Sequence, residues 1–82
     1  MKLEGKVAIV TGGAMGNGLG IVKVFLKYGA DVIIIDNSDK LQATLQELRN
    51  PKVLGYSGDI RDKNMMNAIV NDVITKKGKI DI

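Results

Sequence analysis

Five of the ten residues from Thr11 to Gly20 are glycine, and they directly follow the apolar run at residues 7–10. Glycine loses more conformational freedom on folding than any other residue, so a cluster indicates unusual dihedrals or a ligand that approaches the main chain. Where a strand ends and a helix begins, free N–H groups and the positive end of the helix dipole attract an anion. The glycines therefore predict a phosphate or pyrophosphate site in which a Cβ atom would obstruct the ligand.

Two familiar glycine motifs do not fit this segment. A Walker loop requires lysine and then serine or threonine after its last glycine, but Leu19 and Gly20 follow Gly18. The dinucleotide motif G-x-G-x-x-G would begin at Gly16, but its last position is Ile21. A turn with tight helix–strand packing stays open as another explanation of the glycines.

A second candidate group is the carboxylate of Asp36, which ends the apolar run at residues 32–35. It lies eighteen residues after Gly18, close to the spacing of about 20 at which an acid contacts the ribose in dinucleotide-binding folds. A carboxylate there can accept from both ribose hydroxyls and would repel a 2′-phosphate. The alternative is that Asp36 only begins the turn toward Ser38.

The elements that would position these groups alternate along the chain. Apolar runs predict strands at residues 6–10, 32–35 and 53–57 and the start of a fourth at 80–82. Three amphipathic helices lie between them, with these apolar stripes: Leu19, Val22, Phe25 and Leu26; Leu41, Leu45 and Leu48; Met66, Ile69, Val70 and Val73. Their boundaries are predicted at Gly29 for the first helix, Ser38 and Pro51 for the second, and Asp62 and Gly78 for the third. Such alternation indicates one α/β unit over residues 1–82, with parallel strands.

Composition excludes several classes of function. The 82 residues contain neither cysteine nor histidine, so disulfides, thiolate metal sites and a histidine base are absent, and no carboxylate spacing indicates a metal site. The net charge of +3 comes from dispersed lysines without a basic, aromatic face, which argues against nucleic-acid binding. No signal peptide or membrane-spanning run is present, so the cytoplasm is the expected location.

One glycine pattern does fit. Residues 11–18 read T-G-x-x-x-G-x-G, which resembles the signature of the short-chain dehydrogenase/reductase family. LEGKVAIVTGG resembles that family's first strand, Asp36 ends the second, Gly58-Asp59-Ile60 ends the third, and GKIDI at 78–82 resembles the approach to the fourth. The resemblance covers the whole chain. It implies the N-terminal half of a three-layer Rossmann-type parallel sheet, with strand order 3-2-1 and the start of strand 4.

The resemblance also implies roles for the glycine segment. Gly12, Gly16 and Gly18 would shape the turn under the cofactor pyrophosphate, while Met15 and Asn17 would line the cofactor through their main chains. Asn17 departs from the isoleucine or leucine that is usual there.

Further roles concern the adenosine end of the cofactor. The Asp59 carboxylate would accept from the adenine amine and the Ile60 N–H would bond the ring, unless Asp59 only helps to cap the next helix. Asp36 would bind the ribose beside Asn37, which like Gly13 supplies no basic group for a 2′-phosphate. NAD(H) is therefore expected in preference to NADP(H).

The family's catalytic residues have no counterpart in this sequence. Tyr28 is followed four residues later by Val32, and Tyr56 by Ile60, so neither forms the Tyr-x-x-x-Lys pair. The first hypothesis is the NAD(H)-binding part of an oxidoreductase acting on an alcohol or ketone, truncated before its catalytic segment and inactive alone. The alternative is a non-catalytic dinucleotide-binding or interaction module, or an inactive truncation product. Either would expose one edge of the first strand, so association with another chain or a family-type homo-oligomer is expected.

Overall fold

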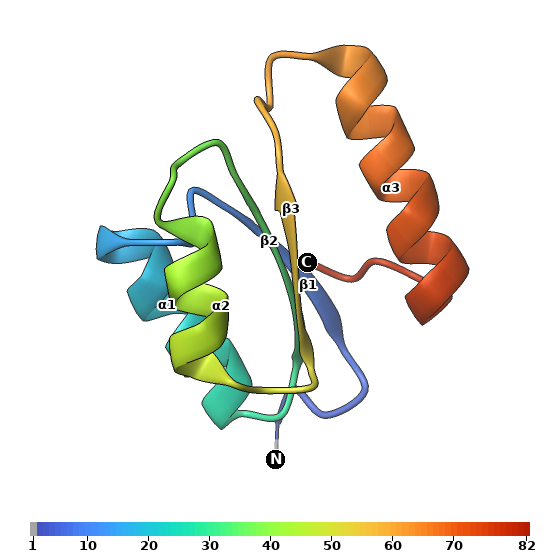
Figure 1. The fold of residues 1–82 in the computed structure, drawn as a ribbon. Coiled ribbons are helices and arrows are strands. Elements are labelled where there is room, and N and C mark those ends of the chain that lie inside the picture. Colours follow the sequence, from blue (N-terminus) through green and yellow to red (C-terminus); the bar gives the residue numbers. More distant parts are fainter. Residues whose placement is uncertain (1) are drawn as a thin grey trace.

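The computed structural model describes residues 2–82. Its strands are β1 (Val7–Thr11), β2 (Asp31–Asp36) and β3 (Val53–Ser57), and its helices are α1 (Gly16–Lys27), α2 (Leu41–Leu48) and α3 (Lys63–Lys77). The strands are parallel and β2 lies between β1 and β3. Helices α1 and α2 cover one face of the sheet and α3 covers the other (Figure 1). The three layers and the 3-2-1 strand order agree with the prediction.

The core lies on both faces of β2, because successive side chains of a strand point to opposite faces. Val32 and Ile34 pack with Val22 of α1 and Leu41 of α2. Ile33 and Ile35 pack on the other face, together with Val7, Ile69 and Val73. All four β2 side chains are fully buried. A strand buried on both faces explains the unbroken run of β-branched residues at 32–35.

Helix boundaries follow the predicted signals in α1 and α3. Gly29, directly after the C-cap of α1, has φ +92°, and Gly78 at the end of α3 has φ +84°. Both are left-handed conformations that favour glycine. The Asp62 carboxylate accepts from the Met65 N–H at 3.1 Å and caps α3 as predicted.

The prediction for the ends of α2 was wrong by a few residues. The N-cap is Lys40, not Ser38, whose hydroxyl accepts from the Lys40 N–H at 3.0 Å in a local turn. The helix ends at Leu48 because Arg49 adopts a left-handed conformation with φ +44°, before Pro51 is reached. Strand β1 likewise begins and ends one residue later than predicted.

Residues 81 and 82 lie along the outer edge of β1, beside which the C-terminus is seen in Figure 1. The Asp81 N–H donates to the Val7 oxygen at 2.8 Å, and the Ile9 N–H donates to the Ile82 oxygen at 3.1 Å. The Asp81 carboxylate also accepts from the Val7 N–H at 2.9 Å. The edge that was expected to be largely unpaired is therefore partly covered by this segment.

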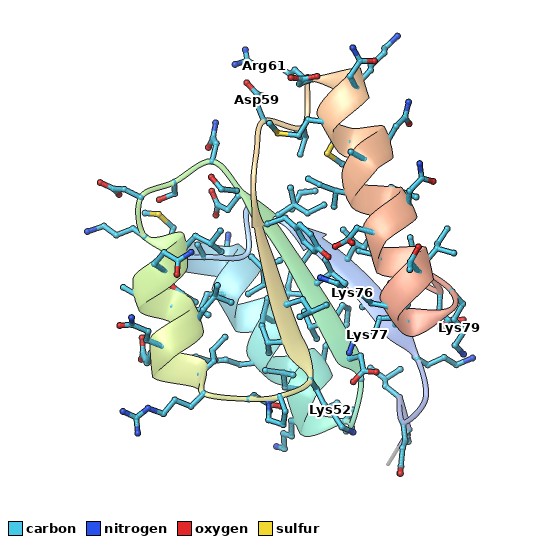
Figure 2. All side chains as sticks on the ribbon, turned by 45° about the vertical axis from the view of Figure 1, so that its right-hand side comes forward. Lys52, Asp59, Arg61, Lys76, Lys77 and Lys79 are labelled. Carbon is cyan, nitrogen blue, oxygen red and sulfur yellow. The ribbon has the colours of Figure 1, made fainter. Side chains whose placement is uncertain are left out.

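Several lysines are engaged with neighbouring groups. Lys76 pairs with Asp72 at 3.1 Å, and Lys79 pairs with Asp81 at 3.2 Å. Lys52 donates to a main-chain oxygen at 3.1 Å. In Figure 2, Lys52 and Lys79 lie toward the opposite end of the sheet from Asp59 and Arg61.

Candidate functional site

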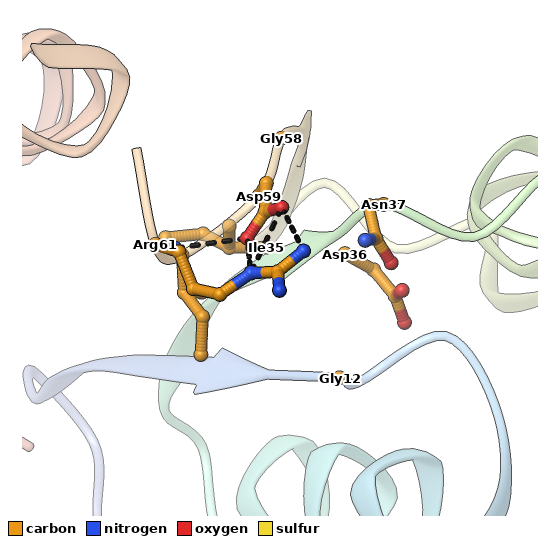
Figure 3. A pocket seen from close by; sticks show the side chains of 8 residues that line it. Gly12, Ile35, Asp36, Asn37, Gly58, Asp59 and Arg61 are labelled. Carbon is orange, nitrogen blue, oxygen red and sulfur yellow. Dashed lines mark hydrogen bonds and ion pairs between the residues drawn. The ribbon is translucent and has the colours of Figure 1, made fainter. Parts of the chain in front are cut away.

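A pocket of about 330 Å³ opens at the carboxyl ends of the strands (Figure 3). In open parallel α/β sheets, ligands bind beyond these strand ends. Its lining residues are Gly12, Ile35, Asp36, Asn37, Gly58, Asp59, Ile60 and Arg61. Its volume falls within the range of small-molecule sites, about 300–1,000 Å³. The fold thus brings the turn after β1 and the ends of β2 and β3 together around one space.

Glycines in the glycine segment, residues 12–18, meet three different geometric requirements. Gly12 has φ +67° and Gly16 has φ +60°, both unfavourable for other residues. A Cβ on Gly18 would lie 2.1 Å from the Gly12 oxygen, so α1 packs directly on the main chain of the turn. A Cβ on Gly13 would lie 3.0 Å from the Ile34 side chain. Tight packing, the alternative explanation, therefore accounts for Gly18 and contributes at Gly13.

The start of α1 presents main-chain donors. Met15 is its N-cap in an extended conformation, and no side chain of the described residues caps this helix end. Gly16 and Asn17 are exposed in the first turn, where N–H groups lack partners within the helix and the dipole is positive. The arrangement suits an anion.

The predicted site residues divide between two places. Five of them line the strand-end pocket: Gly12, Asp36, Asn37, Asp59 and Ile60. Gly16 and Asn17 instead border a second pocket of about 530 Å³ along α1. Met15 and Gly18 line neither pocket, and the Met15 sulfur accepts from the Ser38 hydroxyl at 3.8 Å.

Asp36 connects the end of β2 to the glycine segment. One carboxylate oxygen accepts from the Ala14 N–H at 3.0 Å, and the other accepts from the Ser38 N–H at 2.9 Å. The side chain of Asp36 is buried, with the residue 8% exposed. The contact with Ser38 is the turn that was considered as an alternative to ribose binding. A carboxylate has about four acceptor positions, so these two bonds leave acceptor capacity on the pocket side.

Asp59 is held by Arg61, two residues later. The guanidinium contacts both carboxylate oxygens, with its closest nitrogen at 2.8 Å, and the Arg61 N–H also donates to the carboxylate at 2.9 Å (Figure 3). These side-chain and main-chain hydrogen bonds from Arg61 lower the pKa of Asp59 from 3.8 to about 2. The carboxylate is therefore ionised throughout the physiological range.

Two residues of this region were missed by sequence reasoning. Arg61 brings a positive charge into the pocket, and its position two residues after Asp59 was the available signal. Thr44 of α2 donates from its hydroxyl to the Ala14 oxygen at 2.6 Å and is buried. Its signal was a polar residue three positions after Leu41, on the helical face that carries the apolar stripe.

The described residues offer neither a metal-binding cluster nor a membrane-spanning helix. Residues 2–82 contain no group of three or more acidic, histidine or cysteine side chains placed to hold a metal ion. None of the helices described has the length and apolar character needed to cross a bilayer.

Comparison with known proteins places this geometry in context. A family model described as short chain dehydrogenase matches residues 6–82. The chain is 42% identical to (+)-borneol dehydrogenase 1 of Salvia officinalis and 37% identical to oxidoreductase UcpA of Salmonella typhimurium. Each match covers 99% of this chain and 31% or 32% of the relative. The chain thus spans about a third of the length of these relatives.

Solved structures share the fold. A putative short-chain dehydrogenase from Novosphingobium aromaticivorans superposes with a TM-score of 0.90 at 30% identity, covering 98% of this chain and 31% of the other. A 3-ketoacyl-(acyl-carrier-protein) reductase from Brucella melitensis, complexed with NADH, superposes with a TM-score of 0.86 at 35% identity. That match covers 95% of this chain and 32% of the reductase.

Proposed function

The chain belongs to the short-chain dehydrogenase family, and we propose that residues 1–82 form the NAD(H)-binding part of an oxidoreductase. The bound cofactor would exchange hydride with the carbon of an alcohol or ketone. The observation that carries the proposal is the strand-end pocket, where an acid from β2 and an acid after β3 meet the glycine turn. No proton-transfer role is assigned to a residue of the described segment.

Different residues would contact different parts of the cofactor. Asp36 and Asn37 would contact the adenosine ribose, while Asp59 and Ile60 would contact the adenine. The main chain around Met15, together with Gly12 and residues 16–18, would contact the diphosphate at the positive end of α1. Asn17 would lie nearest the nicotinamide half. The open pocket and the uncapped helix start support this assignment.

We expect the unphosphorylated cofactor to bind more tightly. A 2′-phosphate beside Asp36 would meet a like charge at close range, which is unfavourable by a few kcal/mol at an effective dielectric constant near 20. Arg61 is the cation that lines this pocket, and its charge is already engaged by Asp59. NAD(H) should therefore bind more than about tenfold more tightly than NADP(H).

Titration of the purified full chain with NAD and NADP tests this proposal. The variant Asn37→Arg should bring the dissociation constant for NADP closer to that for NAD, because it adds a cation to the pocket without removing Asp36. The matched control Gln42→Arg adds the same charge at an exposed position of α2 that does not line the pocket, and should leave the ratio of the two dissociation constants unchanged. Equal affinities of the unmodified chain for both cofactors would overturn the assignment.

Location and assembly are further parts of the proposal. The cytoplasm is the proposed location, on the sequence grounds given above. Association with another copy or a partner chain is proposed through the outer edge of β1 beyond residues 81 and 82, or through family-type contacts. Sedimentation of the purified full chain measures the second point directly.

A further inference from the structure

Ala14 lies between the two halves of the glycine segment, and both of its main-chain polar groups are held by side chains. Its N–H donates to Asp36 at 3.0 Å and its carbonyl oxygen accepts from Thr44 at 2.6 Å. Ala14 is 2% exposed, so these groups need protein partners in place of water. The final ladder bond before it is Gly12 N–H to the Ile35 oxygen at 2.8 Å. Beyond that point the turn depends on side chains from β2 and α2.

Thr44 is unusual for its place in α2. It is buried with Leu41 nearby on the same helix, where an unpaired hydroxyl would be unfavourable. Its hydroxyl reaches a residue thirty positions earlier in the sequence. A valine of the same shape would fill the space equally well, so packing alone does not explain a hydroxyl at this position.

We propose that Thr44 is a positioning residue for cofactor binding: its hydroxyl fixes the Ala14 carbonyl and thereby the turn that presents Gly16 and Asn17 to the diphosphate. This inference rests on the proposed function. Thr44 lines neither pocket, and it acts through the main chain of Ala14. Because apparent affinity falls in proportion to the fraction of molecules with a competent site, a looser turn weakens binding without changing any contact to the ligand.

The Ala14 amide donates to Asp36, so its hydrogen exchange in the purified full chain, without ligand, reports how often the turn opens and tests whether Thr44 holds it closed. Thr44→Val should accelerate this exchange roughly tenfold, because the buried carbonyl loses its partner. Thr44→Ser keeps the hydroxyl and should restore slow exchange. The control Thr75→Val removes a hydroxyl that bonds within α3, to the Asn71 oxygen at 2.9 Å, and should leave Ala14 unchanged.

The Val73 amide, in the buried part of α3, distinguishes a local effect from general destabilisation. Equal acceleration at Val73 and Ala14 in Thr44→Val would overturn the inference, as would unchanged exchange at Ala14.

NMR titration with NAD and with adenosine tests the positioning role. Thr44→Val should raise the dissociation constant for NAD roughly three- to tenfold and leave that for adenosine unchanged, with recovery in Thr44→Ser. Faster exchange at Ala14 with unchanged NAD affinity would refute positioning. If the unmodified chain bound no NAD, the proposed function and the positioning role would both fail, while the exchange data would still decide whether Thr44 holds the turn.

Discussion

Replacing Asp36 should damage the fold as well as any ribose contact. The carboxylate accepts from two main-chain N–H groups, those of Ala14 and Ser38, at 3.0 and 2.9 Å. Asp36→Ala removes both acceptors. Asp36→Asn keeps one oxygen acceptor and turns an NH₂ group toward the other N–H, so one of the two bonds becomes a donor–donor contact.

The expected loss is large for a small domain. A hydrogen bond to a charged group contributes about 1.5–3 kcal/mol net, so loss of both bonds in Asp36→Ala should lower the free energy of unfolding by about 3–6 kcal/mol. Asp36→Asn should lower it by about 2–3 kcal/mol on the same principle. The total free energy of unfolding of a domain of this length is expected to be only about 4–12 kcal/mol. The neighbouring Asn37 is exposed, and Asn37→Ala should change the free energy of unfolding by less than about 0.5 kcal/mol.

Urea unfolding of the purified full chain, followed by circular dichroism, measures these differences if the slope m stays constant. Midpoints of Asp36→Ala and Asn37→Ala that agree within error would refute the reasoning, because Asp36 would then not hold the turn. If the prediction is right, weaker NAD binding by an Asp36 variant cannot be assigned to the ribose alone. The specificity test above therefore alters Asn37 instead.

Two further predictions concern a tightly packed glycine and an ion pair. Gly18→Ala should lower the free energy of unfolding by about 1–3 kcal/mol, because the new Cβ would lie 2.1 Å from the Gly12 main-chain oxygen. At Gly20 a Cβ would meet no atom within 4 Å, so Gly20→Ala should raise the free energy of unfolding by about 0.5–1 kcal/mol. Equal effects in urea unfolding would contradict the packing argument. Arg61→Gln should raise the pKa of Asp59 from about 2 toward 3.8, measured by carboxyl ¹³C NMR. Because the folded pKa is lowered, Asp59 stabilises the protein above pH 3.8 and loses this effect as the pH falls toward 2. The variant should show a smaller loss, since the main-chain N–H of residue 61 still donates to Asp59. An unchanged pKa would disprove the side-chain interaction.

The fold was predictable because its signals are local and repeated. The short, β-branched apolar run at 32–35 favours a strand. Asp62 and Gly78 stand at the ends of α3, where caps favour such residues. The ends of α2 were missed because Ser38 satisfies a turn before the helix begins, and because Arg49 takes a conformation that its residue type disfavours. Hydrophobic periodicity predicts neither the turn at Ser38 nor the left-handed conformation of Arg49.

The candidate site was predictable only as a set of strand-end residues. Spacing brought Asp36 and Asp59 to the same edge of the sheet, and the pocket contains both. Spacing could not reveal that Asp36 bonds Ala14, or that Thr44 meets the same residue from the other side, since these contacts span 22 and 30 residues. The ion pair of Asp59 depends on a side-chain conformation in the turn, which composition does not specify.

Because the chain is synthesised from its N-terminus, β1 is made well before Asp81, which contacts it in the folded chain. Val7 and Asp81 are 74 residues apart, so at about 5–20 residues per second the ribosome needs roughly 4–15 seconds between them. Until Asp81 has been made, β1 lacks the partner that covers part of its outer edge in the folded chain, and an unpaired strand edge can pair with a neighbouring polypeptide. Protection of the earliest strand is thus deferred, and faster translation would shorten the time for which its edge stays open.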